Sequence, residues 1–244
     1  MRPIKISLIT AVFGRFDEIP PQPLGFDEYI LLSDEPIESD WKNIVVGGAG
    51  DSRLASKVPK FRPDLFVSNN SSVWMDASLR DPNSWLYEAS ESVLTKHQIS
   101  FFRHPDRSNV SDEVELSLTL FKYHRMPLAE QLNHYRALGF NDESGLWACG
   151  VIARNHTEEV RKLGDRWLQE NVLWSTQDQI SLPFLLQEMN LTPGEFPADL
   201  WKGPLNWVVH KFNDYEHPKG QNLISRNFKG VLARFIRKIF FPAA

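Results

Sequence analysis

The chain has 244 residues, of which 42% are hydrophobic and 24% charged, a balance typical of a globular protein with a substantial core. This composition argues against a disordered chain. The formal net charge is −4, and it is about −9 without the five basic residues of 226–244, which argues against nucleic acid as a partner. The single cysteine, Cys149, excludes an intrachain disulfide and a thiolate metal cluster. Because the N-terminus also lacks a recognisable secretory signal, we expect a cytoplasmic protein.

The first half of the chain alternates between strand-like and helix-like segments. Apolar, β-prone runs predict strands at 5–12, 29–33, 41–46, 72–76 and 99–102. A helix is expected to begin at Asp51 or Ser52 and to be limited by Pro59 and Pro63, and a second helix is expected over 84–95. Strands that alternate with helices predict an α/β fold with a mostly parallel central sheet flanked by helices.

The second half is predicted to be mainly helical. Helices are expected over 112–122, 127–138 and 157–174, with one more strand over 146–153. We expect Asn155 to start the helix over 157–174, and a further helix to open at 175–179. Since no repeat or linker is evident, we predict a single domain over 1–225, followed by a basic amphipathic helix over 226–244.

Three polar segments follow predicted strands: 13–17, 76–78 and 104–107. In parallel sheets ligands bind outside the carboxyl ends of the strands, so we expect these segments to lie on one rim. Asp76 at a strand end is suited to a hard cation such as Mn²⁺ or Mg²⁺, which bridges a carboxylate to a diphosphate. An ordinary turn is the alternative interpretation of Asp76.

The motifs also occur in a recognisable order. They read TAVFGRFD at 10–17, DSRLASK at 51–57, SVWMDAS at 72–78, FRHPDR at 102–107 and STQDQ at 175–179. This series resembles the TOD1/MUCI70 glycosyltransferase-like domain family over roughly residues 4–200. The resemblance implies a GT-A-like fold that binds a nucleoside diphosphate sugar.

The resemblance assigns the donor site to several of these motifs. Asp76 takes the place of the first acid of the metal motif, and Ser78 the place of its second acid. Because a hydroxyl is a poorer cation ligand than a carboxylate, a metal-dependent and a metal-independent site both remain as alternatives. The resemblance places Phe13, Gly14 and Asp17 around the base and ribose, although a plain turn is the alternative.

Basic side chains are expected to neutralise the donor phosphates. Arg53 and Lys57, with Lys60 as a weaker candidate, have this role, and a solvated helix face is the alternative. His104 and Arg107 are expected to bind donor phosphate or acceptor hydroxyls, unless they serve only the hydrogen bonds of their loop.

The resemblance places Asp178 and Gln179 beside the transferred sugar. Asp178 is expected either to act as general base for the acceptor hydroxyl or, with Gln179, to position the sugar and stabilise the transition state. A simple helix cap is the alternative, and Glu113 is the next candidate carboxylate. His210 and His217 are expected to complete the metal site, which would favour manganese.

The basic tail has its own pattern. Apolar residues recur along one helical face from Phe228 to Phe240. The tail over 226–244 holds five Lys or Arg residues and no acid. This pattern predicts a helix at an anionic membrane surface, on the inner face of the membrane, with a helix packed on the domain as the alternative.

Together these features predict a glycosyltransferase that moves a sugar from a nucleotide-sugar donor to a glycan or lipid-linked acceptor, as in polysaccharide biosynthesis. A non-catalytic module that binds nucleotide sugars or carbohydrate is the alternative, because Ser78 replaces an acid. A phosphohydrolase that uses Asp76 is less favoured because no second acidic cluster accompanies this residue.

Overall fold

The computed structural model describes residues 4–14, 17–46, 52–123 and 125–208. Within this part, seven strands form one sheet in the order β3-β2-β1-β4-β7-β6-β8. The strands are β1 (Ile6–Val12), β2 (Glu28–Ser33), β3 (Lys42–Val45), β4 (Ser71–Met75), β6 (Ile99–Arg103), β7 (Trp147–Asn155) and β8 (Gly194–Glu195). A separate pair consists of β5 (Leu79–Arg80) and β9 (Asn206–Trp207).

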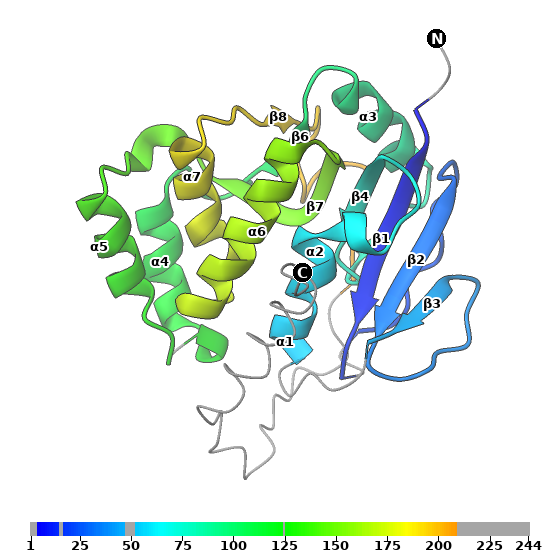
Figure 1. Ribbon diagram of the computed structural model, residues 1–244, viewed down its shortest axis with the longest axis horizontal. Helices are drawn as coiled ribbons and strands as arrows, with labels where there is room; N and C mark the ends of the chain where they lie inside the picture. The colour runs from blue at the N-terminus through cyan, green and yellow to red at the C-terminus, as the bar shows by residue number, and fades with distance from the viewer. Residues whose placement is uncertain (1–3, 15–16, 47–51, 124, 209–244) are drawn as a thin grey trace, which may run out of the picture.

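The sheet is mostly parallel. Only β7 runs against its neighbours β4 and β6, whereas the other adjacent strands of this sheet are parallel. Consequently β1, β2, β4 and β6 all end at the same side of the sheet, which we call the carboxyl edge. In Figure 1, β1 runs down the view toward this edge, where α1 lies.

Helices cover both faces of the sheet. The longer ones are α3 (Trp85–Leu94), α4 (Val110–Thr119), α5 (Leu128–Ala137), α6 (Glu158–Leu173) and α7 (Asp178–Glu188). Two short helices, α1 (Ser52–Ala55) and α2 (Lys57–Phe61), precede the 3₁₀ turns η1 (Pro63–Leu65), η2 (Phe121–Tyr123) and η3 (Asp142–Ser144). In Figure 1, α2 and α6 lie side by side in front of the sheet, with α4, α5 and α7 to one side.

Two apolar clusters correspond to the two faces. All seven residues of β1 are buried, as expected of a central strand, and its side chains alternate between the clusters. One cluster joins the sheet to α2, α4, α5, α6 and α7, and the other joins it to α3. The predicted α/β fold is therefore confirmed, and it is consistent with the GT-A-like class.

Some local expectations differ from the structure. Asn155 is the last residue of β7, and Thr157 instead caps α6 by accepting a hydrogen bond from the Val160 N–H at 3.4 Å. The reason is that β7 pairs with β4 as far as Asn155, which keeps this residue extended. The helix expected after Asp51 is divided into α1 and α2, and the helix predicted at 175–179 begins at Asp178.

The predicted helix over 226–244, together with His210 and His217, lies outside the described residues. The division into a domain over 1–225 and a tail therefore stays a prediction, as does membrane binding by the tail. Among the described residues, no helix is both long and apolar enough to cross a membrane.

Candidate functional site

Two lysines and two aspartates form a buried chain of ion pairs at the carboxyl edge. Lys57 Nζ lies 2.6 Å from Asp178 Oδ1, and Lys60 Nζ lies 2.9 Å from Asp178 Oδ2. Lys60 Nζ also lies 3.2 Å from Oδ1 of Asp76. The side chains of Lys57, Lys60 and Asp178 are less than a tenth exposed, whereas that of Asp76 is 32% exposed. The cluster therefore opens to solvent through Asp76.

The four members of this cluster come from three parts of the fold. Asp76 follows the buried strand β4, and its N–H donates to the Gly150 carbonyl on β7 at 2.8 Å. Lys57 and Lys60 are three positions apart on α2 and therefore share a helix face. Asp178 is the first residue of α7, where the positive end of the helix dipole favours a carboxylate.

Close packing against α6 fixes the position of α2. The Phe61 ring stacks on Trp167 with centroids 4.2 Å apart. A Cβ atom on Gly164 would lie only 2.2 Å from the Phe61 carbonyl oxygen, so only glycine allows this approach of α2 to α6. The lysines are thus held by a rigid contact between two helices.

The ion pairs favour the charged forms of Asp178 and Lys60, whereas burial opposes the charge on Lys57. Burial opposes ionisation of Asp178, but Lys57 and Lys60 outweigh it and hold the pKa of Asp178 below its ordinary value. Burial likewise opposes the charge on Lys60, but Asp178 and Asp76 raise its pKa well above the ordinary value. Burial lowers the pKa of Lys57, an effect that Asp178 opposes and Lys60 reinforces. A depressed pKa makes Asp178 a weak base at neutral pH.

A second polar group lies beside the first and includes Glu113. This side chain is buried, and its oxygens accept from Arg107 Nε at 2.6 Å and from Gln177 Nε2 at 2.5 Å. Gln177 precedes Asp178 at the start of α7 and also accepts from the Tyr123 hydroxyl at 3.2 Å. The Glu113 carboxylate therefore positions Arg107 and the start of α7.

His104 takes part in the hydrogen bonds of its own loop. Its Nδ1 accepts from the backbone N–H groups of Asp106 at 3.2 Å and Arg107 at 3.1 Å. Burial and the Arg107 charge lower the pKa of His104, so the ring is neutral at pH 7. This geometry favours the loop interpretation for His104 and leaves the guanidinium of Arg107, whose side chain is 21% exposed, as the accessible group.

Of the described residues just after β1, Gly14 offers its backbone and Phe13 presents no aromatic face. The Phe13 ring is buried in the core, which favours a packing role over contact with a base. Gly14 has φ +66°, and its N–H donates to Asp34 Oδ2 at 2.9 Å after β2. Asp17 interacts electrostatically with Arg80.

Arg53 lies at the same edge, on α1. Its Nη1 donates to the Lys122 carbonyl at 3.0 Å, and its guanidinium lies 5.8 Å from the centroid of the Tyr123 ring. Since Tyr123 also contacts Gln177, the guanidinium lies beside the two polar groups. Gln179, the other residue expected beside the sugar, is half-buried on α7.

A family model for the TOD1/MUCI70 glycosyltransferase-like domain matches residues 31–203, more than half of the chain. The chain belongs to this family. The matched range contains the lysine and aspartate cluster, but it begins after β1 and so excludes Phe13, Gly14 and Asp17. A search of curated proteins found no match.

The TOD1/MUCI70 domain also carries an exposed aromatic pair that the sequence patterns did not reveal. The rings of Trp201 and Trp207 are 45% and 43% exposed and lie 5.0 Å apart, nearly perpendicular. Trp201 Nε1 donates to Asp106 Oδ2 at 3.1 Å. Val208, the residue after Trp207, donates its N–H to the Ser78 carbonyl at 2.8 Å. The pair therefore lies beside the ends of β4 and β6. Neither a tryptophan in a turn nor one in a two-residue strand belongs to a periodic pattern that would identify it.

The described residues do not assemble the metal site that the resemblance implied. Asp76 Oδ1 already accepts from Trp74 Nε1 at 2.6 Å and pairs with Lys60, while Ser78 is buried. Within the described part of the chain, no group of three or more His, Cys, Asp or Glu side chains is placed to hold a metal ion. His210 and His217 are not among these residues, and their predicted role stays a prediction.

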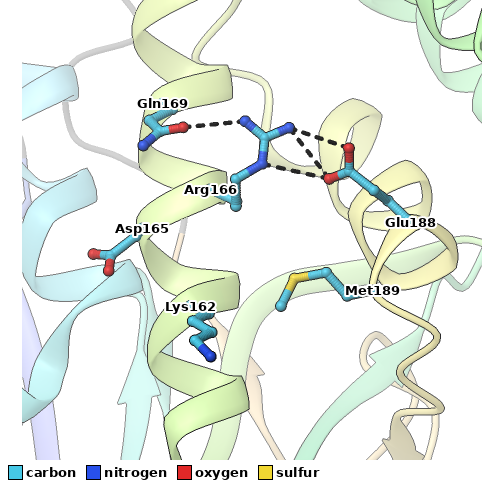
Figure 2. A pocket seen from close by; sticks show the side chains of 6 residues that line it. All are labelled: Lys162, Asp165, Arg166, Gln169, Glu188 and Met189. Atoms are coloured by element: carbon cyan, nitrogen blue, oxygen red, sulfur yellow. Dashed lines mark hydrogen bonds and ion pairs between the residues drawn. The ribbon is translucent and has the colours of Figure 1, made fainter.

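A surface hollow on this domain lies apart from these groups. It is formed between α6 and α7 by Lys162, Asp165, Arg166, Gln169, Glu188 and Met189 (Figure 2). Arg166 crosses it and pairs with Glu188 at 3.2 Å (Figure 2). None of the predicted site residues lines this hollow, so it does not contribute to the candidate site.

Proposed function

We propose that the protein transfers a sugar from a nucleoside diphosphate sugar to a glycan or lipid-linked acceptor. Membership of a glycosyltransferase-like family supports this general role. The observation that carries the proposal is the pair of lysines, Lys57 and Lys60, held on one buried carboxylate at the carboxyl edge. In α/β sheets this edge is where nucleotides bind.

The lysines suit the chemistry of a diphosphate leaving group. When the acceptor hydroxyl oxygen bonds to the anomeric carbon, its proton passes to solvent. The bond from that carbon to the phosphate oxygen breaks, and its electron pair leaves with the diphosphate. Fixed cations aimed at this growing negative charge stabilise the transition state in a site from which water is excluded. Lys57 and Lys60 have fixed positions because α2 packs on α6 and both ammonium groups pair with Asp178.

Asp178 is proposed as the residue that positions these lysines. Both of its oxygens are engaged by ammonium groups and its pKa is depressed, which favours a positioning role over that of a general base. Asp76 is the carboxylate of the cluster that is open to solvent, with its side chain 32% exposed. We therefore propose that Asp76, not Asp178, faces the reacting groups.

The tryptophan pair is proposed to bind the acceptor. Trp201 and Trp207 expose flat apolar faces next to the polar loop of Asp106, a combination that suits a pyranose ring with its apolar face and hydroxyl groups. Trp201 contacts Asp106, which follows β6, and the residue after Trp207 contacts Ser78, which follows β4. Because β6 and β1 lie on opposite sides of β4 in the sheet, the pair lies on the side of Asp76 away from β1. Donor and acceptor would thus approach Asp76 from two sides.

A panel of nucleotide sugars tests this proposal. Thermal unfolding is measured with UDP-, GDP-, ADP- and CMP-linked sugars, and a donor present at about 100 times its Kd should add about 2.7 kcal/mol to stability. Release of the free nucleotide, a diphosphate or, from CMP-linked sugars, CMP, is then followed with glycan and lipid-linked acceptors. Binding without release or transfer would instead identify a non-catalytic binding module.

A further inference from the structure

Lys60 occupies an unusual position between two carboxylates that come from different elements. Its Nζ lies 2.9 Å from Asp178 Oδ2 at the start of α7 and 3.2 Å from Asp76 Oδ1 at the end of β4. The lysine side chain is 7% exposed. Lys60 is thus bound by two acids beside a strand end, as a divalent metal ion is in a metal-assisted site.

The surroundings of Lys60 hold the ammonium group in this position. Trp74 Nε1 donates to the same Asp76 oxygen at 2.6 Å, and the Trp74 ring lies 5.6 Å from Lys60 Nζ. The indole thus orients the carboxylate and also contacts the cation through its face. Since Asp178 and Asp76 keep the pKa of Lys60 well above its ordinary value, the ammonium is a permanent charge across the neutral range.

A metal ion would have to displace this lysine. Mn²⁺ or Mg²⁺ requires about six oxygen ligands at about 2.1 Å, and an ammonium group within hydrogen-bond distance of both acids occupies the same region. The second acid of the usual motif is replaced by Ser78, which is buried. The site therefore has fewer oxygen ligands beside Asp76 than a motif with two acids has. The Lys60 ammonium already supplies one positive charge there.

We infer that the Lys60 ammonium takes the place of a divalent metal, bridging Asp76 to the donor diphosphate, so that the donor binds without metal. This inference rests on the proposed function, because it concerns how the same donor is held. Lys57 supplies a second positive charge on the opposite oxygen of Asp178. The two ammonium groups together carry the charge of one divalent ion.

The test is calorimetric titration of UDP, GDP and ADP into the full-length protein, with EDTA in one series and MnCl₂ in the other. For the nucleotide that binds, we expect wild-type affinity to differ by less than about twofold between the series, well below the roughly tenfold change that corresponds to 1.4 kcal/mol. A wild-type affinity that falls about tenfold or more in EDTA would overturn the inference but leave the proposed function intact. Failure of every nucleotide and nucleotide sugar to bind would overturn both.

Variants separate the role of Lys60 from a structural one. Lys60→Ala should lose about tenfold or more in affinity in EDTA, and Mn²⁺ should restore part of it because Asp76 and Asp178 are then open to a metal ion. Adding Asp76→Asn to Lys60→Ala should remove this restoration. Lys60→Arg keeps the charge and serves as the control if Lys60→Ala unfolds, and its affinity should remain independent of Mn²⁺. Metal-dependent binding by folded Lys60→Arg would contradict the inference.

Discussion

Lys57 and Asp178 are 121 positions apart in the sequence, yet their side chains form a buried ion pair with Nζ and Oδ1 2.6 Å apart. A buried pair of this kind contributes little net stability, because desolvation offsets the attraction between the charges. Removing one partner is nevertheless costly, because the other charge remains buried. The pair is therefore better explained by a requirement for charge at this edge than by stability.

Replacing Lys57 should weaken donor binding. Lys57→Met removes one ammonium group but leaves Asp178 paired with Lys60, so the protein should fold. Loss of one charged contact to the diphosphate should raise the donor Kd by about tenfold or more. Lys162→Met is the matched control, because Lys162 is a lysine whose side chain is 64% exposed and pairs only with Glu158 among the described residues. Equal affinities for the two variants in calorimetry would contradict the role of Lys57.

Asp178→Asn should affect both stability and donor affinity. The amide keeps the size of the side chain but leaves Lys57 and Lys60 without their shared counter-charge. Breaking a buried pair typically costs about 3–5 kcal/mol, which denaturant unfolding will measure. Because the lysines lose their position, donor Kd should rise together with a fall in kcat. A fall in kcat with an unchanged Kd would instead assign Asp178 to the chemical step.

Gly164→Ala tests whether the contact between α2 and α6 positions the lysines. The added methyl group would meet the Phe61 carbonyl oxygen and must displace α2. Overpacking of this kind costs about 1–3 kcal/mol, and we expect donor affinity to fall as well although no charged group is changed. Glu159→Ala, on the exposed face of α6, is the control. Unchanged affinity in folded Gly164→Ala would show that the lysines tolerate movement of α2.

The tryptophan pair should determine acceptor binding. Trp201→Ala and Trp207→Ala should each raise the acceptor KM, by up to about tenfold if the lost ring contact contributes about 0.5–1.5 kcal/mol. The donor KM should not change. Leu138→Ala, a truncation of a residue that is 61% exposed on the domain surface, should change neither constant. A selective rise in the donor KM would assign the pair to the nucleotide base.

His156 should make the fold less stable in acid. Burial and the Arg154 charge lower the pKa of His156 to about 4, below its ordinary value of 6.5. Between these values the unfolded chain binds a proton that the folded chain does not, so stability falls as pH falls, by at most about 1.4 kcal/mol per pH unit. Urea unfolding from pH 7 to pH 4 will measure this slope, and His156→Gln should reduce it. An identical slope in the variant would show that other groups are responsible.

Patterns that extend over several neighbouring residues allowed most of the fold to be predicted. The buried runs of β1 and β4 and the long helix α6 follow from local apolar patterns, although the cap of α6 was wrongly assigned to Asn155. The ends of β1 and β4 were correctly expected at one edge. The two-residue strands β5, β8 and β9 carry no such pattern and were missed. Their pairing depends on contacts between distant segments.

The candidate site was only partly accessible to the same reasoning. Asp76, Lys57, Lys60 and Asp178 were each predicted as candidates, but the ion pairs that join them were not. These pairs depend on how α2 and α7 meet at the end of β4. The alternative of a solvated face for Lys57 and Lys60 is wrong, since both are buried. No local signal distinguishes a buried lysine with a distant partner from an exposed one.

The most direct test of the proposed function is release of nucleoside diphosphate by the full-length protein, measured with its identified donor and acceptor. The wild-type protein should release nucleotide in proportion to glycosylated product, and folded Lys57→Met should release it at least about tenfold more slowly at low donor concentration. Lys162→Met should match the wild type. A wild-type protein that binds no nucleotide sugar, or a Lys57→Met variant with wild-type turnover, would contradict the assignment of the buried lysine and aspartate cluster as the donor site of a glycosyltransferase.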